Sequence, residues 1–176
     1  MAIRHADPGR DAEACAAIYA PAVTGGVASF EEVAPPPGEM AARIARVSAT
    51  HAWLVEELHG AVTGYAYASP HHPRAGYRWA ADVAVYVDPA RHRQGVGRRL
   101  YGALLPLLRD RGLRMACAGI TLPNPGSVGL HEAVGFVPVG VYRRIGWKHG
   151  AWRDVGWWQL DLAPGAPDPP AEPTPP

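Results

Sequence analysis

The chain has 176 residues, 48% of them hydrophobic, which is enough for one domain with a substantial core. Its formal net charge of +1 argues against a nucleic-acid-binding face and against a polybasic segment that binds membranes. The N-terminus lacks the apolar stretch of a signal peptide, and no apolar run reaches membrane-spanning length. Cys15 and Cys117 lie in apolar periodic segments and indicate no disulfide framework. We therefore expect a cytoplasmic protein.

Two helices and three strands are predicted in the first part of the chain. Asp7-Pro8 is a typical helix start, and Pro35-Pro36-Pro37 precedes the second helix. His59-Gly60 predicts a hairpin between two strands, and residues 27–33 form a loop or a short strand. In chain order the elements are strand 2–5, helix 9–22, helix 39–48, strand 52–58 and strand 61–68.

The segment from Asp82 to Tyr101 combines a strand, a turn and a helix. β-Branched residues alternate from Val83 to Val87, which predicts a buried strand that Asp88-Pro89 ends. Apolar residues then recur at helical spacing from Val96 to Leu108. A basic turn separates the strand from the helix.

That turn has the features of a phosphate-binding site. Gly95 and Gly97 let the backbone approach a ligand, and the first N–H groups of the helix have no internal partner. Those amides and the helix dipole attract an anion. The arginines nearby are Arg93, Arg98 and Arg99.

The remaining sequence completes a mixed sheet. It predicts strand 113–120, helix 127–134 and two closing strands, 136–146 and 152–162. From Pro164 the chain is rich in proline and has no apolar pattern. We expect one domain over residues 1–163, of the α/β (α+β) class with helices on both faces of a mixed sheet, and a disordered Pro-rich tail over residues 164–176.

Several motifs resemble the GNAT superfamily of N-acetyltransferases. One is R-H-R-Q-G-V-G-R-R-L-Y from Arg91, and another is N-x-x-S-x-x-L-H-E-A-V-G-F from Asn124. L-P-N-P-x-S-V from Leu122 and W-K-H-G-A-W-R-D-V-G-W-W-Q from Trp147 make the resemblance closest to phosphinothricin N-acetyltransferases and their methionine sulfoximine-acetylating relatives. The match covers nearly all of residues 3–162.

This resemblance implies a mostly antiparallel GNAT sheet with a splayed pair of parallel strands, acetyl-CoA as co-substrate, and a homodimer. Position 92 departs from the family pattern, because His92 stands where Gln or Arg is usual, so modestly weaker CoA binding is expected. The residues implied to bind acetyl-CoA are Val85, Tyr86, Val87, Arg93, Gln94, Gly95, Val96, Gly97, Arg98 and Asn124.

N-acetylation needs a base, because an α-amine is mostly protonated at neutral pH. Asp82 is the candidate. The resemblance implies Glu at the matching position, so the shorter Asp82 needs a raised pKa and acts directly or through a bridging water. His131 occupies the position of a tyrosine that protonates the CoA thiolate in most GNAT proteins. The alternatives are a strand-end aspartate and a packed helix histidine.

The acceptor is expected to be a small molecule with an α-amine and a carboxylate. The resemblance favours Arg74 and Tyr77 as residues that bind its anionic group, and Phe30 could form the opposite wall. Arg78 is a further candidate for the anionic group. The alternatives are a solvated loop for Arg78 and core packing for Phe30. His71 and His72 lack a third ligand at fitting spacing, so no metal is expected.

Other functions remain open from the sequence. The acceptor could be another small amine or a protein N-terminus, or the chain could be a CoA-binding or sensing module with weak catalysis. A nucleotide-phosphate binder is a weaker alternative, since the turn lacks the Lys-Ser/Thr of a P-loop and the third glycine of a dinucleotide fingerprint.

Overall fold

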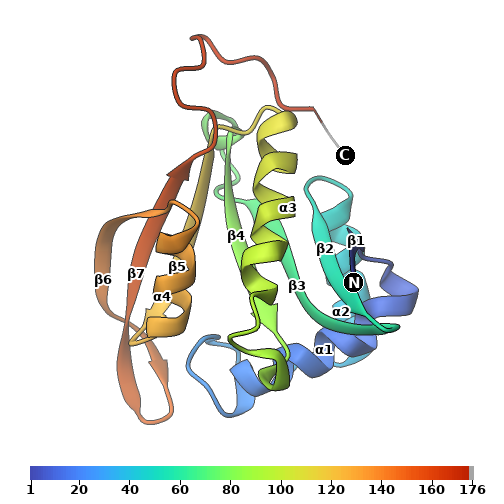
Figure 1. Ribbon diagram of the computed structural model, residues 1–176. Helices are drawn as coiled ribbons and strands as arrows, with labels where there is room; N and C mark the ends of the chain where they lie inside the picture. The colour runs from blue at the N-terminus through green and yellow to red at the C-terminus, as the bar shows by residue number, and fades with distance from the viewer. Residues whose placement is uncertain (175–176) are drawn as a thin grey trace.

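The computed structural model describes residues 1–174 as a seven-stranded sheet with helices on both faces (Figure 1). The strands are β1 Ala2–His5, β2 Trp53–Leu58, β3 Ala61–Pro70, β4 Ala80–Val87, β5 Met115–Leu122, β6 Val137–Lys148 and β7 Ala151–Asp161. The helices are α1 Pro8–Thr24, α2 Pro37–Ser48, α3 Val96–Asp110 and α4 Pro125–Ala133.

The strand order is β1-β2-β3-β4-β5-β7-β6. Neighbouring strands run antiparallel except β4 and β5, which run parallel. This arrangement confirms the predicted mixed, mostly antiparallel sheet. The two halves of the sheet meet at the parallel pair, and in Figure 1 β4 lies next to α3 while β5 lies next to α4.

Two hydrophobic clusters hold the helices to the sheet. On one face, α1 and α2 bury Cys15 and Ile44 against Val55 and Tyr65. On the other face, α3 buries an apolar stripe centred on Leu104 against β2 to β5. No helix in residues 1–174 combines the length and apolar character needed to cross a membrane.

Local sequence signals set several boundaries as predicted. The Asp7 side chain accepts hydrogen bonds from the backbone N–H groups of Gly9 and Arg10, so it caps α1. His59 and Gly60 both have positive φ, 51° and 83°, which fits a tight hairpin between β2 and β3. Residues 27–33 form the loop alternative and contain no strand.

The segment after β7 has no helix or strand through residue 174 and folds back over the end of α3 (Figure 1). The Arg78 guanidinium pairs with the Glu172 carboxylate at 2.6 Å, and the Thr174 N–H donates to the Arg111 carbonyl at 2.9 Å. The last two residues of the predicted tail lie outside the described residues. The disordered tail therefore stays a prediction.

Candidate functional site

A cleft opens where the parallel strands part. β4 and β5 pair only at Ala80–Met115, Ala81–Ala116 and Asp82–Cys117, although β4 continues to Val87. A cavity of about 690 Å³ lies between the diverging strands, with α3, α4 and the turn before α3 around it. Beyond Asp82, the β4 backbone groups that face β5 have no ladder partner and are available to a ligand. The predicted splayed pair is confirmed.

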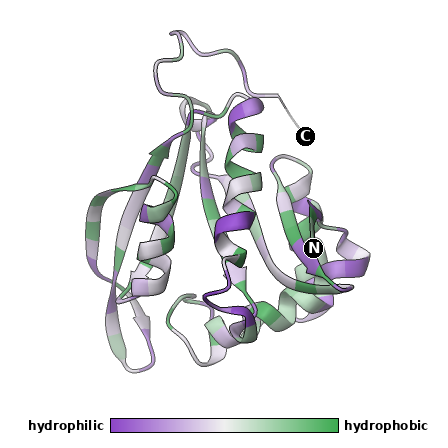
Figure 2. Ribbon diagram, viewed as in Figure 1, coloured by the Kyte–Doolittle hydropathy of each residue, from purple (hydrophilic) through white to green (hydrophobic). Residues whose placement is uncertain are grey.

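The turn before α3 forms a concave row of backbone amides. It is the hydrophilic segment, purple in Figure 2, at the lower end of that helix. Arg93 has φ 61° and Gly95 has φ 78°, so left-handed residues alternate with ordinary ones. Gly95 is also the N-cap of α3 and provides no side-chain cap. This backbone shape and the open helix N-terminus make an anion site.

A buried ion pair fixes this turn to the sheet. The Arg99 guanidinium donates to both oxygens of the Glu56 carboxylate, at 2.7 and 2.9 Å, and to the Gln94 carbonyl at 2.9 Å. Glu56 is 1% exposed, and the hydrogen bonds from Arg99 lower the pKa of its carboxyl. Arg99 therefore holds the turn in place, whereas the side chains of Arg93 and Arg98 remain exposed.

The structure brings together nearly all the residues that the resemblance assigns to acetyl-CoA. Each of them lines the cavity except Gln94, whose side-chain amide donates to the Ala90 carbonyl at 3.1 Å. His92, the departure from the family pattern, lies 3.0 Å from the Val87 carbonyl through its Nε2 atom. Both side chains thus support the strand end and the turn.

His131 lies in the cavity lining but is almost fully enclosed. Its Nδ1 atom is 2.8 Å from the Ser127 carbonyl and its Nε2 atom is 2.8 Å from the Tyr101 hydroxyl. Burial lowers the pKa of the ring. A neutral ring that donates from Nδ1 and accepts at Nε2 satisfies both contacts. Asn124, at the start of α4, accepts the Ser127 N–H at 3.1 Å.

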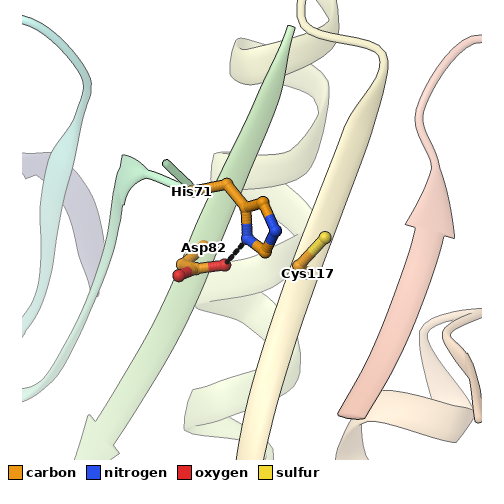
Figure 3. A group of neighbouring side chains, drawn as sticks. All are labelled: His71, Asp82 and Cys117. Atoms are coloured by element: carbon orange, nitrogen blue, oxygen red, sulfur yellow. Dashed lines mark hydrogen bonds and ion pairs between the residues drawn. The ribbon is translucent and has the colours of Figure 1, made fainter. Parts of the chain in front are cut away.

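Asp82 stands at the last paired position of β4 and β5, next to Val83, where the cavity lining begins, and pairs with a histidine (Figure 3). Its Oδ1 atom lies 2.7 Å from Nδ1 of His71, which follows the last residue of β3. Burial raises the pKa of the Asp82 carboxyl, and the hydrogen bond to His71 opposes part of that rise. Within residues 1–174, Nε2 of His71 makes no hydrogen bond, and in the tautomer that donates Nδ1–H to Asp82 this atom carries a lone pair.

His71 was predicted only as a possible metal ligand, without a connection to Asp82. The connection comes from the β3–β4 register, in which Ser69 faces Asp82 and Pro70 faces Ala81. A predicted hairpin between these strands, with its register, would have been the signal. The sequence predicts strands at 61–68 and 83–87 and no element between them.

The three predicted acceptor-binding residues occupy different surroundings. The Tyr77 ring lies 5.8 Å from the His71 ring, and Tyr77 is 46% exposed. Phe30 packs over the backbone of Gly146, where an added Cβ would meet its ring at 2.5 Å. Arg74 is exposed. Among residues 1–174, no hydrogen bond joins the Arg74 guanidinium to another group, and none of these three side chains bonds to Asp82.

The comparisons with known proteins agree with this geometry. The acetyltransferase (GNAT) family matches residues 24–136. Over 137 residues the chain is 42% identical to a phosphinothricin N-acetyltransferase of Streptomyces viridochromogenes, covering 78% of this chain and 75% of that protein. Over 157 residues it is 42% identical to one of Alcaligenes faecalis, covering 88% and 80% respectively.

One solved structure and one further relative indicate the same family. A GNAT superfamily phosphinothricin acetyltransferase from Sinorhizobium meliloti, in complex with acetyl-CoA, superposes with a TM-score of 0.91 at 34% identity. The superposition covers 97% of this chain and 93% of that one. An L-methionine sulfoximine/L-methionine sulfone acetyltransferase of Salmonella typhimurium is 37% identical over 109 residues, 62% of this chain and 64% of that protein. The chain belongs to the acetyltransferase (GNAT) family.

Proposed function

We propose that the chain transfers the acetyl group of acetyl-CoA to the α-amine of a small amino-acid-like acceptor, of the phosphinothricin or methionine sulfoximine type. The observation that carries the proposal is the strand separation directly beyond Asp82, with an amide-lined turn at one end and the Asp82–His71 pair at the other. The names of the similar enzymes support this acceptor class.

The turn and the open edge of β4 fit acetyl-CoA. The amides from Arg93 to Arg98 would hold the pyrophosphate, because a helix N-terminus and a concave amide row favour an anion. The β4 edge from Val85 to Val87 would bind the pantetheine and acetyl groups through its free backbone groups. Bound acetyl-CoA supplies an acetyl group already activated as a thioester. The N–H of Tyr86 or Val87 is the candidate donor to its carbonyl oxygen.

The Asp82–His71 pair would remove the proton from the acceptor amine. With Nδ1–H donated to the carboxylate, the His71 ring presents Nε2 as a proton acceptor, directly or through one water. The Asp82 carboxylate fixes the tautomer and stabilises the imidazolium that forms. The pair therefore supplies general-base function that a short aspartate would supply less well alone.

We assign to His131 a hydrogen bond that stabilises the departing CoA thiolate, which then takes its proton from solvent. A neutral ring holds its proton on Nδ1, where it is bonded to Ser127, so the ring must exchange that bond for one to the sulfur. Tyr101 holds the opposite nitrogen and orients the ring during this exchange. Its contribution should be smaller than that of Asp82, because a thiolate is a good leaving group.

Acceptor recognition is proposed for Arg74 and Tyr77, with Phe30 as the opposite wall. Tyr77 adjoins His71, so it is placed to contact an acceptor whose amine lies near the Asp82–His71 pair. The exposed guanidinium of Arg74 can bind a carboxylate or phosphinate in a bidentate manner. A homodimer remains part of the proposal, supported by exposed apolar side chains on β6 and at the start of β7: Val137, Val139, Val141, Tyr142, Ile145, Trp147 and Trp152.

The test is thiol release from acetyl-CoA with a panel of amines, followed by mass spectrometry of the products. We expect rapid acetylation of L-phosphinothricin or L-methionine sulfoximine, and little with a polyamine or a peptide N-terminus. Rapid turnover of the peptide alone would overturn the acceptor class. Binding of acetyl-CoA without turnover of any amine would favour a sensing module instead.

A further inference from the structure

Three side chains from separate parts of the chain meet at the closed end of the cleft. They are His71, just after β3, Asp82 on β4 and Cys117 on β5 (Figure 3). One ligand atom of each residue lies within 4.8 Å of the others. The parallel register places Asp82 directly beside Cys117, and the hydrogen bond of 2.7 Å brings His71 to Asp82.

The strand register thus supplies the additional ligands that the local sequence around His71 lacks. The neighbouring His72 does not join the group, since its Nδ1 atom accepts the Arg74 N–H at 3.2 Å. The other cysteine, Cys15, lies on the buried face of α1 and is fully enclosed in the hydrophobic cluster that α1 and α2 form with the sheet. All three clustered side chains are partly exposed, so an ion from solvent can reach them.

Imidazole nitrogen, carboxylate oxygen and thiolate sulfur are the ligands that Zn²⁺ prefers. Zinc bonds of about 2.0 to 2.3 Å place tetrahedral ligand atoms roughly 3.5 Å apart. The cluster needs only small side-chain movements to reach such spacing, because its atoms already lie within 4.8 Å. Three protein ligands would leave a fourth position open to water or to an acceptor group.

We propose that His71, Asp82 and Cys117 form a binding site for a thiophilic divalent cation, Zn²⁺, and that the bound ion inhibits acetyl transfer. On binding, Cys117 loses its thiol proton to solvent and forms a Zn–S bond. The ion takes the place of the Nδ1 proton between His71 and Asp82, and that proton moves to Nε2 of the neutral ring. Nε2 can then no longer accept a proton from an amine. The inhibitory half of this proposal rests on the proposed function, whereas the binding half does not.

Binding is tested without any turnover, by titrating Co²⁺ into the metal-free protein and recording the thiolate-to-cobalt charge-transfer absorption. We expect one equivalent of Co²⁺ to give the band and Zn²⁺ to remove it. Cys117→Ala and His71→Phe should lose the band, while the matched controls Cys15→Ala and His72→Ala should keep it. No band in the parent protein, or a band that survives Cys117→Ala, would overturn the site.

Inhibition is tested by adding Zn²⁺ to the acetyl-transfer assay and reversing it with a chelator. Cys117→Ala should retain the basal rate, because Cys117 has no part in the proposed transfer, and should need at least tenfold more Zn²⁺ for half inhibition. Equal sensitivity of the parent and this variant would refute the inhibitory role. If the metal-free protein acetylates nothing, the proposed function fails, and the cobalt band still decides whether the site exists.

Discussion

The two ends of the cleft are built in different ways. At the cofactor end, a contiguous turn presents backbone amides, and one buried ion pair between Arg99 and Glu56 holds it. At the proposed acceptor end, side chains from β4, β5 and the residue after β3 meet only because of strand register, and they remain partly exposed. The turn of the first end is local in sequence, whereas the second end is assembled from distant residues.

The difference has a functional consequence. A site made from backbone amides should tolerate changes of side chain, and His92, which departs from the family pattern that the resemblance implies, still bonds to the strand end. A site made from side chains should change its chemistry with each substitution. In the proposed function, Asp82 and its partner His71 are such a pair.

The largest expected effect is at the acceptor end. Asp82→Asn keeps the shape of the side chain but removes the charge that orients His71. General-base loss should lower kcat/KM for the acceptor roughly 100- to 10,000-fold. The dissociation constant of acetyl-CoA, measured by calorimetry, should stay within about twofold, since the cofactor end is separate.

The control is Asp110→Asn, on the exposed last turn of α3, which should behave like the parent protein. A parallel loss of acetyl-CoA affinity in Asp82→Asn would show that the two ends are not independent. Unchanged activity would remove Asp82 from the reaction.

Among the substitutions at the cofactor end, Arg99→Gln should lower the free energy of unfolding most. It leaves the Glu56 carboxylate buried without its ion pair, and we expect a loss of about 2 to 3 kcal/mol of unfolding free energy, measured with urea. Because the pKa of Glu56 is lowered in the folded state, the pair contributes above the unfolded pKa of about 4.3, and its contribution is lost as the pH falls through the folded pKa.

The stability difference between parent and Arg99→Gln should therefore shrink in acid. Arg98→Gln, the exposed neighbour, is the control for stability and should cost little. A difference that stays constant from neutral pH to well below 4 would contradict the role of the ion pair.

A smaller effect is expected from Gly97→Ala. An added Cβ at Gly97 would lie 2.8 Å from Cδ2 of Leu130, so the Leu130 side chain, which lines the cavity, must move. We expect roughly tenfold weaker acetyl-CoA binding, or about 1.4 kcal/mol. Gly102→Ala, on the same helix with no atom within 4 Å of the added Cβ, should bind like the parent.

Leu130→Ala in the Gly97→Ala background should recover part of the affinity by making room. If the Gly97→Ala and Gly102→Ala variants both bind acetyl-CoA like the parent protein, the close contact between Gly97 and Leu130 does not shape the cofactor site.

The smallest effect is expected for His92→Ala. It removes one exposed hydrogen bond to the Val87 carbonyl, which should weaken acetyl-CoA binding about twofold, or about 0.5 kcal/mol. His92→Gln should restore it. A loss of tenfold or more would mean that the side chain, and not only the backbone, holds the cofactor.

The contrast between the two ends of the cleft also explains which features could be predicted from sequence. Periodicity and turn residues located the helices, the strands and the turn at Gly95, because these features depend on neighbours in the chain. The short pairing of β4 with β5 followed from the family resemblance. The contact of Asp82 with His71 and Cys117 could not be predicted, because it depends on two strand registers that no local signal sets. Likewise, nothing near Arg99 in the sequence pointed to Glu56 on β2.

A double-mutant cycle on the Asp82–His71 pair tests the central claim most directly. kcat/KM for L-phosphinothricin would be measured for the parent protein, Asp82→Asn, His71→Phe and the double variant, at saturating acetyl-CoA. If the two residues act as one base, each single variant loses nearly as much activity as the double variant. Losses that multiply, or a His71→Phe variant with the activity of the parent, would contradict the account.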